Sequence, residues 1–171
     1  KEAEKQAPQA GLGIAIANSM RAMYLSPAGA SAWQAFGAAN GKYTAVDRPT
    51  KLQISFAVST ANGCRYCTLH QVLGLRRAGV DVAKLVAMQK DDSVLTPSEL
   101  TAVQFARKLT KAPNSVTDVD YQKLKSTFGE QGAMEVVMQT CNFAFMNRFT
   151  DNLRLPSEDE AVRVYKEVYG K

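Results

Sequence analysis

Two cysteines and a histidine are the residues whose types and spacing could carry chemistry in this chain. Cys64 and Cys67 form a CxxC pair in the segment Cys64-Arg65-Tyr66-Cys67, and His70, the only histidine, follows three residues later. On a helix this spacing places side chains on one side of adjacent turns. A disulfide between the two sulfurs is then sterically reasonable. A neutral His70 imidazole on the same face could accept the Cys67 proton, directly or through water.

The residues before the pair predict that the cysteines lie at a helix N-terminus. Asn62-Gly63 favours the left-handed conformation that ends a helix, so a new helix is expected to begin near Cys64. Free backbone N–H groups and the positive end of the helix dipole stabilise a thiolate there. Arg65 adds a nearby cation. A cysteine so placed is expected to have the lowered pKa that nucleophilic thiol chemistry requires.

Zinc binding is the competing interpretation of the same residues. Cys64, Cys67 and His70 could supply three ligands, with a fourth from Cys141 or Glu135. Structural zinc usually stabilises small folds with little hydrophobic core, whereas 46% of this chain is hydrophobic. We therefore favour redox chemistry without a bound metal or other cofactor. Cys141, in an apolar helical stretch, is expected to be a buried small hydrophobe.

The elements that must position these residues are predicted to be helices. Apolar residues recur at spacings of three and four, and no alternation is long enough for a strand. Thr96-Pro97-Ser98-Glu99 forms a capping box, and Asp81 is a plausible cap for a short helix. The long helix from Gln131 is expected to carry one apolar side, formed by Met134, Val137, Met138, Cys141, Phe145 and Phe149. The expected helices cover roughly residues 11–24, 27–41, 49–62, 64–79, 81–86, 97–111, 117–129, 131–153 and 157–171.

These elements predict an all-α fold, a bundle of about eight helices joined by short connections. A length of 171 residues fits a single domain, 1–171. Residues 1–10 are polar and contain proline, and we expect them to be a flexible N-terminal segment. Residues 157–171 are expected to form a terminal helix, capped by Pro156-Ser157 and Glu160.

Composition and charge exclude several classes of protein. The formal net charge is +5, but the basic residues are scattered along the chain, which argues against nucleic-acid binding. The apolar runs are short and interrupted, so no membrane span is expected. The chain begins at Lys1 rather than at an initiator Met. A cytoplasmic location is expected, and a periplasmic or secreted one stays open.

Residues 52–70, LQISFAVSTANGCRYCTLH, resemble the alkylhydroperoxidase D (AhpD) / carboxymuconolactone decarboxylase family, and most closely its peroxidase-related branch. Two later segments, residues 95–109 and 142–151, are similar to that branch's next helix and to its long C-terminal helix. The likeness covers roughly residues 15 to 155. It implies an AhpD-like all-α fold and assembly into dimers, trimers or hexamers. In the redox-active members it also implies a cycling CxxC disulfide.

The resemblance also implies roles for individual residues. In the peroxide-reducing members the second cysteine attacks peroxide and the first resolves it, which assigns attack to Cys67 and resolution to Cys64. Those members carry a relay glutamate twelve residues before the first cysteine, where this chain has Leu52. Their histidine stands four residues after the second cysteine, where this chain has Gln71. His70 lies about 100° round the helix from that place.

Other residues are candidates for supporting roles. Glu135 lies among apolar residues near the start of the longest helix, where a buried acid would have a raised pKa; a solvated surface glutamate is the alternative. Tyr66, between the cysteines, is a second candidate for a proton relay. Asn147, Arg148 and Asp151 share a helical face, which we interpret as a helix contact or a subunit interface.

The sequence therefore predicts a thiol-dependent oxidoreductase that reduces a small-molecule peroxide, with Cys64, Cys67 and His70 as its catalytic residues. A dithiol or thioredoxin-like protein would be the electron donor, and the chain would act as a homo-oligomer. Two alternatives stay open. One is a carboxymuconolactone decarboxylase-type lyase, whose chemistry does not depend on a CxxC pair. The other is a non-catalytic metal-binding or scaffold member, which Leu52 and Gln71 would fit.

Overall fold

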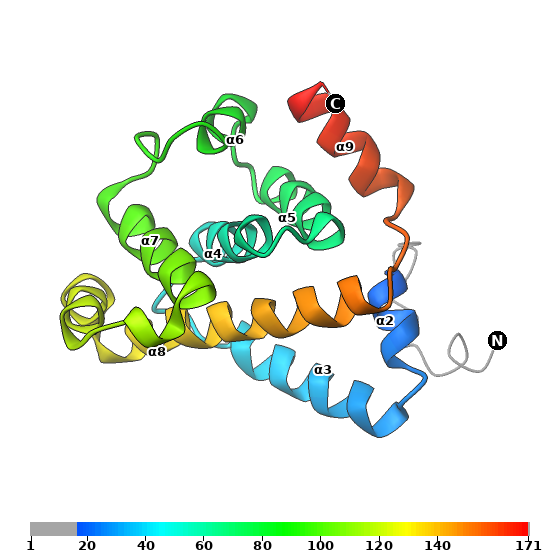
Figure 1. Cartoon of the computed structure of the whole chain (residues 1–171), viewed down its shortest axis with the longest axis horizontal. Helices are drawn as coiled ribbons and strands as arrows, with labels where there is room; N and C mark the ends of the chain where they lie inside the picture. The colour runs from blue at the N-terminus through cyan, green and yellow to red at the C-terminus, as the bar shows by residue number, and fades with distance from the viewer. Residues whose placement is uncertain (1–16, 171) are drawn as a thin grey trace.

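A computed structural model describes residues 17–170 of the chain, and within them every regular element is a helix. This confirms the predicted all-α class. A short 3₁₀ turn, Pro113–Ser115, joins α7 to α8. The α-helices, labelled as in Figure 1, are α2 (Asn18–Met23), α3 (Pro27–Gly41), α4 (Arg48–Ala61), α5 (Arg65–Arg77), α6 (Val82–Met88), α7 (Pro97–Lys111), α8 (Asp118–Asn152) and α9 (Asp159–Tyr169).

Side-chain hydrogen bonds cap the starts of α6 and α7. The predicted Thr96 capping box is present, with the Thr96 hydroxyl and the Glu99 carboxylate each accepting a hydrogen bond from the other residue's backbone N–H. Asp81 caps α6 by accepting from the Ala83 N–H at 2.6 Å, also as predicted. The predicted cap of the terminal helix is wrong. Glu158 is the N-cap residue of α9 and makes no capping hydrogen bond, because its carboxylate is bound elsewhere.

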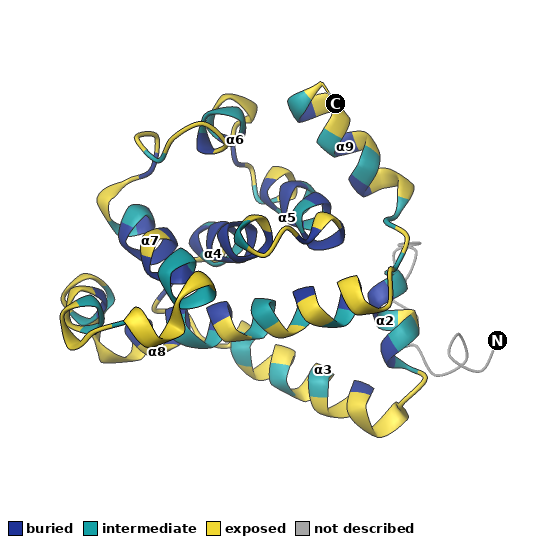
Figure 2. Ribbon diagram, viewed as in Figure 1, coloured by how far each residue is buried: buried dark blue, intermediate teal, exposed yellow. Residues whose placement is uncertain are grey.

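Helix α4 lies at the centre, between α5, α7 and α8 (Figure 1). Its residues 53–59 are all buried, so the helix has no solvent face along this stretch (Figure 2). Its apolar side chains join two core clusters, one shared with α5, α6 and α9 and the other with α7 and α8. Buried polar residues on α4 need partners within the protein, and the partner of Ser59, Asn147 of α8, also contacts Cys67.

Helix α8 is bent at Gly129, where φ is +72° and ψ is 177°. A positive φ favours glycine, which has no Cβ. The sequence predicts two helices with a boundary at this residue. The bend confirms the boundary, and the two helical segments follow each other without a connecting loop. The second segment crosses the molecule beside α4 and α5 and brings Asn147 and Thr150 to the cysteines.

The N-terminal part of the chain is described only in part. The predicted flexible segment 1–10 and the first half of the predicted helix 11–24 lie outside the described residues. Helix α3 follows and extends away from the central helices (Figure 1), and Ala30 is its only buried residue. Among residues 17–170, no helix is both long enough and apolar enough to cross a membrane.

Candidate thiol redox site

Cys64 is the junction of two helices. At the end of α4, the Cys64 N–H donates to the Ser59 carbonyl at 2.9 Å and the Gly63 N–H donates to the Thr60 carbonyl at 3.2 Å. This Schellman pattern requires a left-handed residue, and Gly63 supplies it with φ +71°. Cys64 is then the N-cap of α5, and its sulfur accepts from the Cys67 N–H at 3.4 Å. The predicted position of the pair at a helix N-terminus is therefore confirmed.

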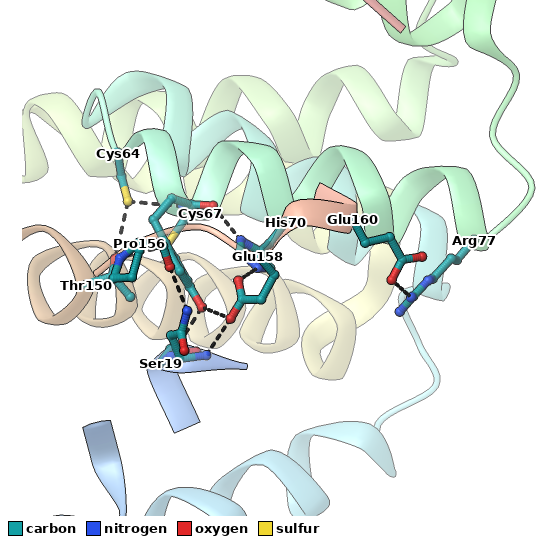
Figure 3. A network of polar contacts seen from close by, with 11 residues as sticks. Ser19, Cys64, Cys67, His70, Arg77, Thr150, Pro156, Glu158 and Glu160 are labelled. Atoms are coloured by element: carbon teal, nitrogen blue, oxygen red, sulfur yellow. Dashed lines mark hydrogen bonds and ion pairs between the residues drawn. The ribbon is translucent and has the colours of Figure 1, made fainter. Parts of the chain in front are cut away.

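Thr150 of α8 brings one hydroxyl group to both sulfurs (Figure 3). Its Oγ1 lies 3.4 Å from Cys64 Sγ and 3.3 Å from Cys67 Sγ. The same hydroxyl is 2.9 Å from the Met146 carbonyl, to which it can donate. Both cysteines are free thiols. A hydroxyl in this place can accept from a thiol or donate to a thiolate, so it suits either protonation state of the pair.

The two thiols differ in acidity because one donates to the other. The hydrogen bond from the Cys64 thiol makes the largest contribution and lowers the pKa of Cys67. Burial would raise this pKa, and hydrogen bonds from Thr150 and Asn147 add to the lowering. The same contact, together with burial, raises the pKa of Cys64. Of the two thiols, Cys67 is therefore the more acidic.

Asn147 fixes the position of α8 against the end of α4. Its Nδ2 donates to Ser59 Oγ at 3.2 Å, and its Oδ1 accepts from Asn62 Nδ2 at 2.8 Å. Ser59 Oγ in turn donates to the Ser55 carbonyl at 2.7 Å. These bonds join the helix that carries Thr150 to the turn before Cys64, so they hold the hydroxyl in register with the sulfurs. The helix contact predicted for Asn147 is present.

A second polar network joins His70 and Tyr66 to Glu158 and Ser19; Figure 3 shows His70 beside Glu158. The rings of His70 and Tyr66 stack with their centroids 4.2 Å apart. His70 Nδ1 lies 2.7 Å from the Tyr66 carbonyl, and its Nε2 forms an ion pair with Glu158. The Tyr66 hydroxyl donates to Glu158 Oε1 at 3.0 Å and accepts from the Ser19 N–H at 3.2 Å. Both ring nitrogens of His70 therefore face oxygen atoms of other groups, the Tyr66 carbonyl and the Glu158 carboxylate.

The ionisation of Glu158 and Tyr66 fits this network. Burial would raise the pKa of Glu158, but the Asn18 N–H and the charge of His70 outweigh it and hold the pKa below its usual value. Burial raises the pKa of Tyr66 to about 12. Tyr66 therefore stays protonated at neutral pH and donates to an ionised Glu158.

The structure brings His70 near the cysteines but directs its ring to other partners. The base role predicted from sequence required a free ring nitrogen facing Cys67, whereas the two nitrogens contact the Tyr66 carbonyl and Glu158. Tyr66 likewise directs its hydroxyl toward Glu158 and Ser19. Tyr66 packs in one cluster with the cysteines, and His70 stacks on Tyr66.

Glu135 lies far from the cysteines. It precedes Thr150 by fifteen residues on the same helix, which corresponds to about 22 Å of helix rise. Its buried carboxylate accepts from the Ala45 and Val46 N–H groups at 3.2 and 3.0 Å and pairs with Lys51 at 3.2 Å. Burial would raise the pKa of Glu135, but these donors outweigh it and hold the pKa below its usual value. The predicted raised pKa is therefore wrong, and so is the alternative of a solvated surface glutamate.

We expect Glu135→Gln to destabilise the protein by about 2 kcal/mol at pH 7, because hydrogen bonds to a charged group are lost and Lys51 is left unpaired. Since the pKa of Glu135 is lowered on folding, its contribution is complete above the unfolded value of about 4.3. That contribution is lost as the pH falls through the folded value. Urea unfolding at pH 7 and at lower pH measures both effects. Glu130→Gln, an exposed carboxylate on the same helix, is the control, and equal stability of the two variants at pH 7 would contradict this role.

The two positions that differ from the resembling family are occupied by packed residues. Leu52 packs against the core cluster of α5, directly over Gly74. Gln71 is buried, and its Oε1 has no hydrogen-bond partner among the described residues. Gln53, beside Leu52, donates to Glu99 Oε1 at 2.6 Å, and Lys84 neutralises that carboxylate at 2.7 Å. The position that the resemblance gives to a relay glutamate is therefore occupied by an apolar side chain, Leu52.

Cys141 and the zinc interpretation both require correction. Cys141 is exposed rather than buried, because the apolar side of α8 on which it lies faces a groove instead of the core. Cys64, Cys67 and His70 do not converge, since the imidazole faces Glu158. Within residues 17–170, no group of three or more His, Cys, Asp or Glu side chains could hold a metal ion.

The fold and the site define an all-α protein with a dithiol at the N-terminus of α5. Residues 27–108 match the model of the carboxymuconolactone decarboxylase family, which supports assignment of the chain to the AhpD / carboxymuconolactone decarboxylase family, as the resemblance predicted. No curated protein shows significant sequence similarity to the chain.

Solved structures share the fold at low sequence identity. The apo form of the debrominase Bmp8 has a TM-score of 0.80 at 21% identity, covering 90% of this chain and 83% of that chain. An uncharacterised peroxidase-related protein from Silicibacter sp. TM1040 has a TM-score of 0.79 at 19% identity, covering 88% and 81%. An uncharacterised peroxidase-related protein with an alkylhydroperoxidase AhpD core, from Ralstonia eutropha JMP134, has a TM-score of 0.75 at 25% identity. The match covers 85% of this chain and 79% of that chain.

Sequence reasoning missed two residues of the site. Thr150 lies within the segment that resembles the family's C-terminal helix, but a threonine in a helix gives no signal that its hydroxyl reaches a thiol. Glu158 was hidden by the apparent cap of the terminal helix. Glu160, which the sequence predicts as part of that cap, pairs with Arg77 at 2.7 Å instead. The sequence carries no signal that Glu158 contacts Tyr66 and His70.

Proposed function

We propose that the protein is a thiol-dependent oxidoreductase that reduces peroxides through a Cys64/Cys67 dithiol–disulfide cycle. The observation that carries the proposal is the shared hydroxyl of Thr150, 3.4 and 3.3 Å from the two sulfurs. Together with the hydrogen bond between the thiols, it favours a thiolate at Cys67 and a protonated Cys64 next to it. A nucleophile beside a resolving thiol is the arrangement that peroxide reduction requires.

The cycle balances with the residues in place. The Cys67 thiolate attacks one oxygen of the peroxide, the O–O bond breaks, and Cys67 becomes a sulfenic acid. The alkoxide that leaves takes the proton of Cys64 and departs as an alcohol, which generates the Cys64 thiolate. That thiolate attacks the Cys67 sulfur, forms the disulfide and releases hydroxide, which solvent protonates to water. A dithiol, either a small molecule or a thioredoxin-like protein, then reduces the disulfide and is itself oxidised.

Peroxide consumption in the presence of a dithiol tests this function. We expect turnover with hydrogen peroxide or an organic hydroperoxide when dithiothreitol is supplied. The assay is best done in a Cys141→Ser background, because Cys141 is exposed and would react independently. Absence of turnover with several peroxides, together with loss of γ-carboxymuconolactone on incubation, would favour the lyase alternative.

We also propose that two copies of the chain associate through the groove between α3 and α8. The groove has a volume of about 820 Å³ and is apolar, with Met23, Trp33, Phe36, Met138, Phe145 and Phe149 among its lining residues. Helix α3 carries no charged residue although almost all of it is exposed. A chain of net charge +5 avoids self-repulsion when it associates through an uncharged face.

Leu25→Glu is expected to convert the oligomer into a monomer of 18.6 kDa, because Leu25 is 84% exposed at the groove and a buried unpaired charge would oppose association. Size-exclusion chromatography with light scattering measures the change. Val119→Glu is the matched control, since Val119 is 77% exposed and does not line the groove. A native protein that is monomeric at micromolar concentration would refute the proposal.

A further inference from the structure

The reactive sulfurs are covered in this structure. Cys64 is 0% exposed and Cys67 is 4% exposed. Met146 and Leu155 pack against the pair. Leu155 belongs to residues 153–158, the connection from α8 to α9, which we call the strap. A large reactant can therefore reach the sulfurs only after the side chains that cover them, such as Leu155, have moved.

Among residues 17–170, the hydrogen bonds of the strap lie near its two ends. Near α8, the Arg154 and Leu155 N–H groups donate to the carbonyls of Asp151 and Thr150 at 3.0 and 3.2 Å. The backbone at Arg154 has φ +50°, in the left-handed region that non-glycine residues rarely adopt. This residue is therefore a strained point at which the chain direction changes.

The other end of the strap is held by the carboxylate of Glu158 (Figure 3). Its Oε1 accepts from the Tyr66 hydroxyl at 3.0 Å and from the Asn18 N–H, and its Oε2 pairs with His70. Asn18 also donates from Nδ2 to the Pro156 carbonyl at 3.0 Å. One side chain thus joins the strap to α5, which carries the thiols, and to the start of α2.

We infer that the strap is a gate over the thiols and that Glu158 is its latch. Closed, the strap seats Leu155 on the cysteines; with the latch released, Leu155 can leave while α9 stays packed through Val164 and Val168 in the core. Glu158 is thus a positioning residue, which acts through Tyr66 and His70 and does not touch the sulfurs. This role explains why the His70 ring faces Glu158: the imidazole is the partner that holds the Glu158 carboxylate in the closed state.

The gate has a consequence for the cycle, and this part rests on the proposed function. Reduction of a disulfide requires an attacking thiolate to reach one of its sulfurs in line with the S–S bond. A thiol carried on another protein cannot approach sulfurs that are almost fully covered. We therefore place strap opening in the reductive half of the cycle, before a thioredoxin-like donor reacts, whereas a small peroxide needs a smaller opening.

Alkylation of Cys67 by a small and a bulky reagent tests the gate without any peroxide. In a Cys141→Ser background, the rates with iodoacetamide and with a polyethylene-glycol maleimide are compared for wild type, Glu158→Gln and Glu158→Ala. We expect the bulky reagent to react at least about tenfold faster with Glu158→Gln and faster still with Glu158→Ala, since each variant weakens the closed state. Iodoacetamide should gain less.

Glu160→Gln is the matched control, because Glu160 lies two residues away and pairs with exposed Arg77 instead of the latch. It should react at the wild-type rate. The pH at which alkylation is half-maximal should stay unchanged in Glu158→Gln, because the gate alters access and not the acidity of Cys67. Wild-type rates with the bulky reagent in both Glu158 variants would overturn the gate, as would a gain that comes only from a shifted pH profile. A protein inactive toward peroxide yet showing the gated rates would refute the proposed function and leave the gate standing.

Discussion

Cys67→Ser is expected to reduce peroxide consumption by about three orders of magnitude or more, a loss typical of removing a covalent nucleophile. The serine hydroxyl is not ionised at neutral pH and cannot attack the O–O bond, whereas the environment of Cys67 favours its thiolate. A peroxide electrode or a coupled dithiol assay measures the rate.

Cys64→Ser should fail in a different way. Cys67 can still attack once, so one equivalent of peroxide is consumed and a sulfenic acid remains that dimedone traps at Cys67. Turnover through the internal disulfide is then lost. Cys141→Ser is the matched control and should retain full activity, since Cys141 lies in the groove away from the pair. Trapping of the sulfenic acid at Cys64 instead would reverse the assignment of the two roles.

Thr150→Val should raise the pKa of Cys67 by about one to two units, because a hydrogen bond to a charged group contributes about 1.5–3 kcal/mol and one pKa unit corresponds to 1.36 kcal/mol. Valine keeps the shape of threonine and removes the hydroxyl that lies 3.3 Å from Cys67 Sγ. Below the pKa of the variant, the alkylation rate at a fixed pH should therefore fall about tenfold or more. The pH dependence of iodoacetamide alkylation measures the shift.

Thr150→Ser is the control for this prediction. Serine restores the hydroxyl and should restore most of the thiolate, although it leaves a small cavity where the methyl group was. If Thr150→Val has the pH profile of the wild type, the hydroxyl does not stabilise the thiolate, and the acidity of Cys67 rests on Cys64, Asn147 and the helix N-terminus.

Local sequence signals predicted the framework of the site well. Asn62-Gly63 indicated a helix end followed at once by a new start, and the structure shows Cys64 closing α4 and capping α5. Such patterns succeed because capping and left-handed turns depend on residues a few positions apart. The resemblance then gave the correct family, which the position of the pair alone did not.

The contacts that complete the site could not be predicted in this way. Thr150 and Glu158 follow Cys67 by more than eighty residues, and their contacts depend on how α8 and the strap pack against α5. Periodicity fixes which residues share a face but not which neighbour that face meets. For the same reason Glu135 was correctly expected among apolar residues, but its amide donors at Ala45 and Val46 come from a distant loop.

The apolar side of α8 shows the same limit of periodicity. Met138, Cys141, Phe145 and Phe149 form one face as predicted, yet they line an open groove instead of the core. An amphipathic pattern reports that a face avoids water. The spacing of the apolar residues does not tell whether this face packs against the same chain or against a second copy of it.

The most direct test of the central claim is the ionisation and oxidation of Cys64 and Cys67, read at each site by mass spectrometry. The pair is alkylated across a pH series and then again after one equivalent of peroxide. A pKa for Cys67 well below the ordinary thiol value of about 8.5, with a Cys64–Cys67 disulfide after peroxide, is the result that a thiol redox centre predicts. Two thiols of ordinary acidity that remain reduced after peroxide would contradict it and favour a binding or scaffold role for this member of the family.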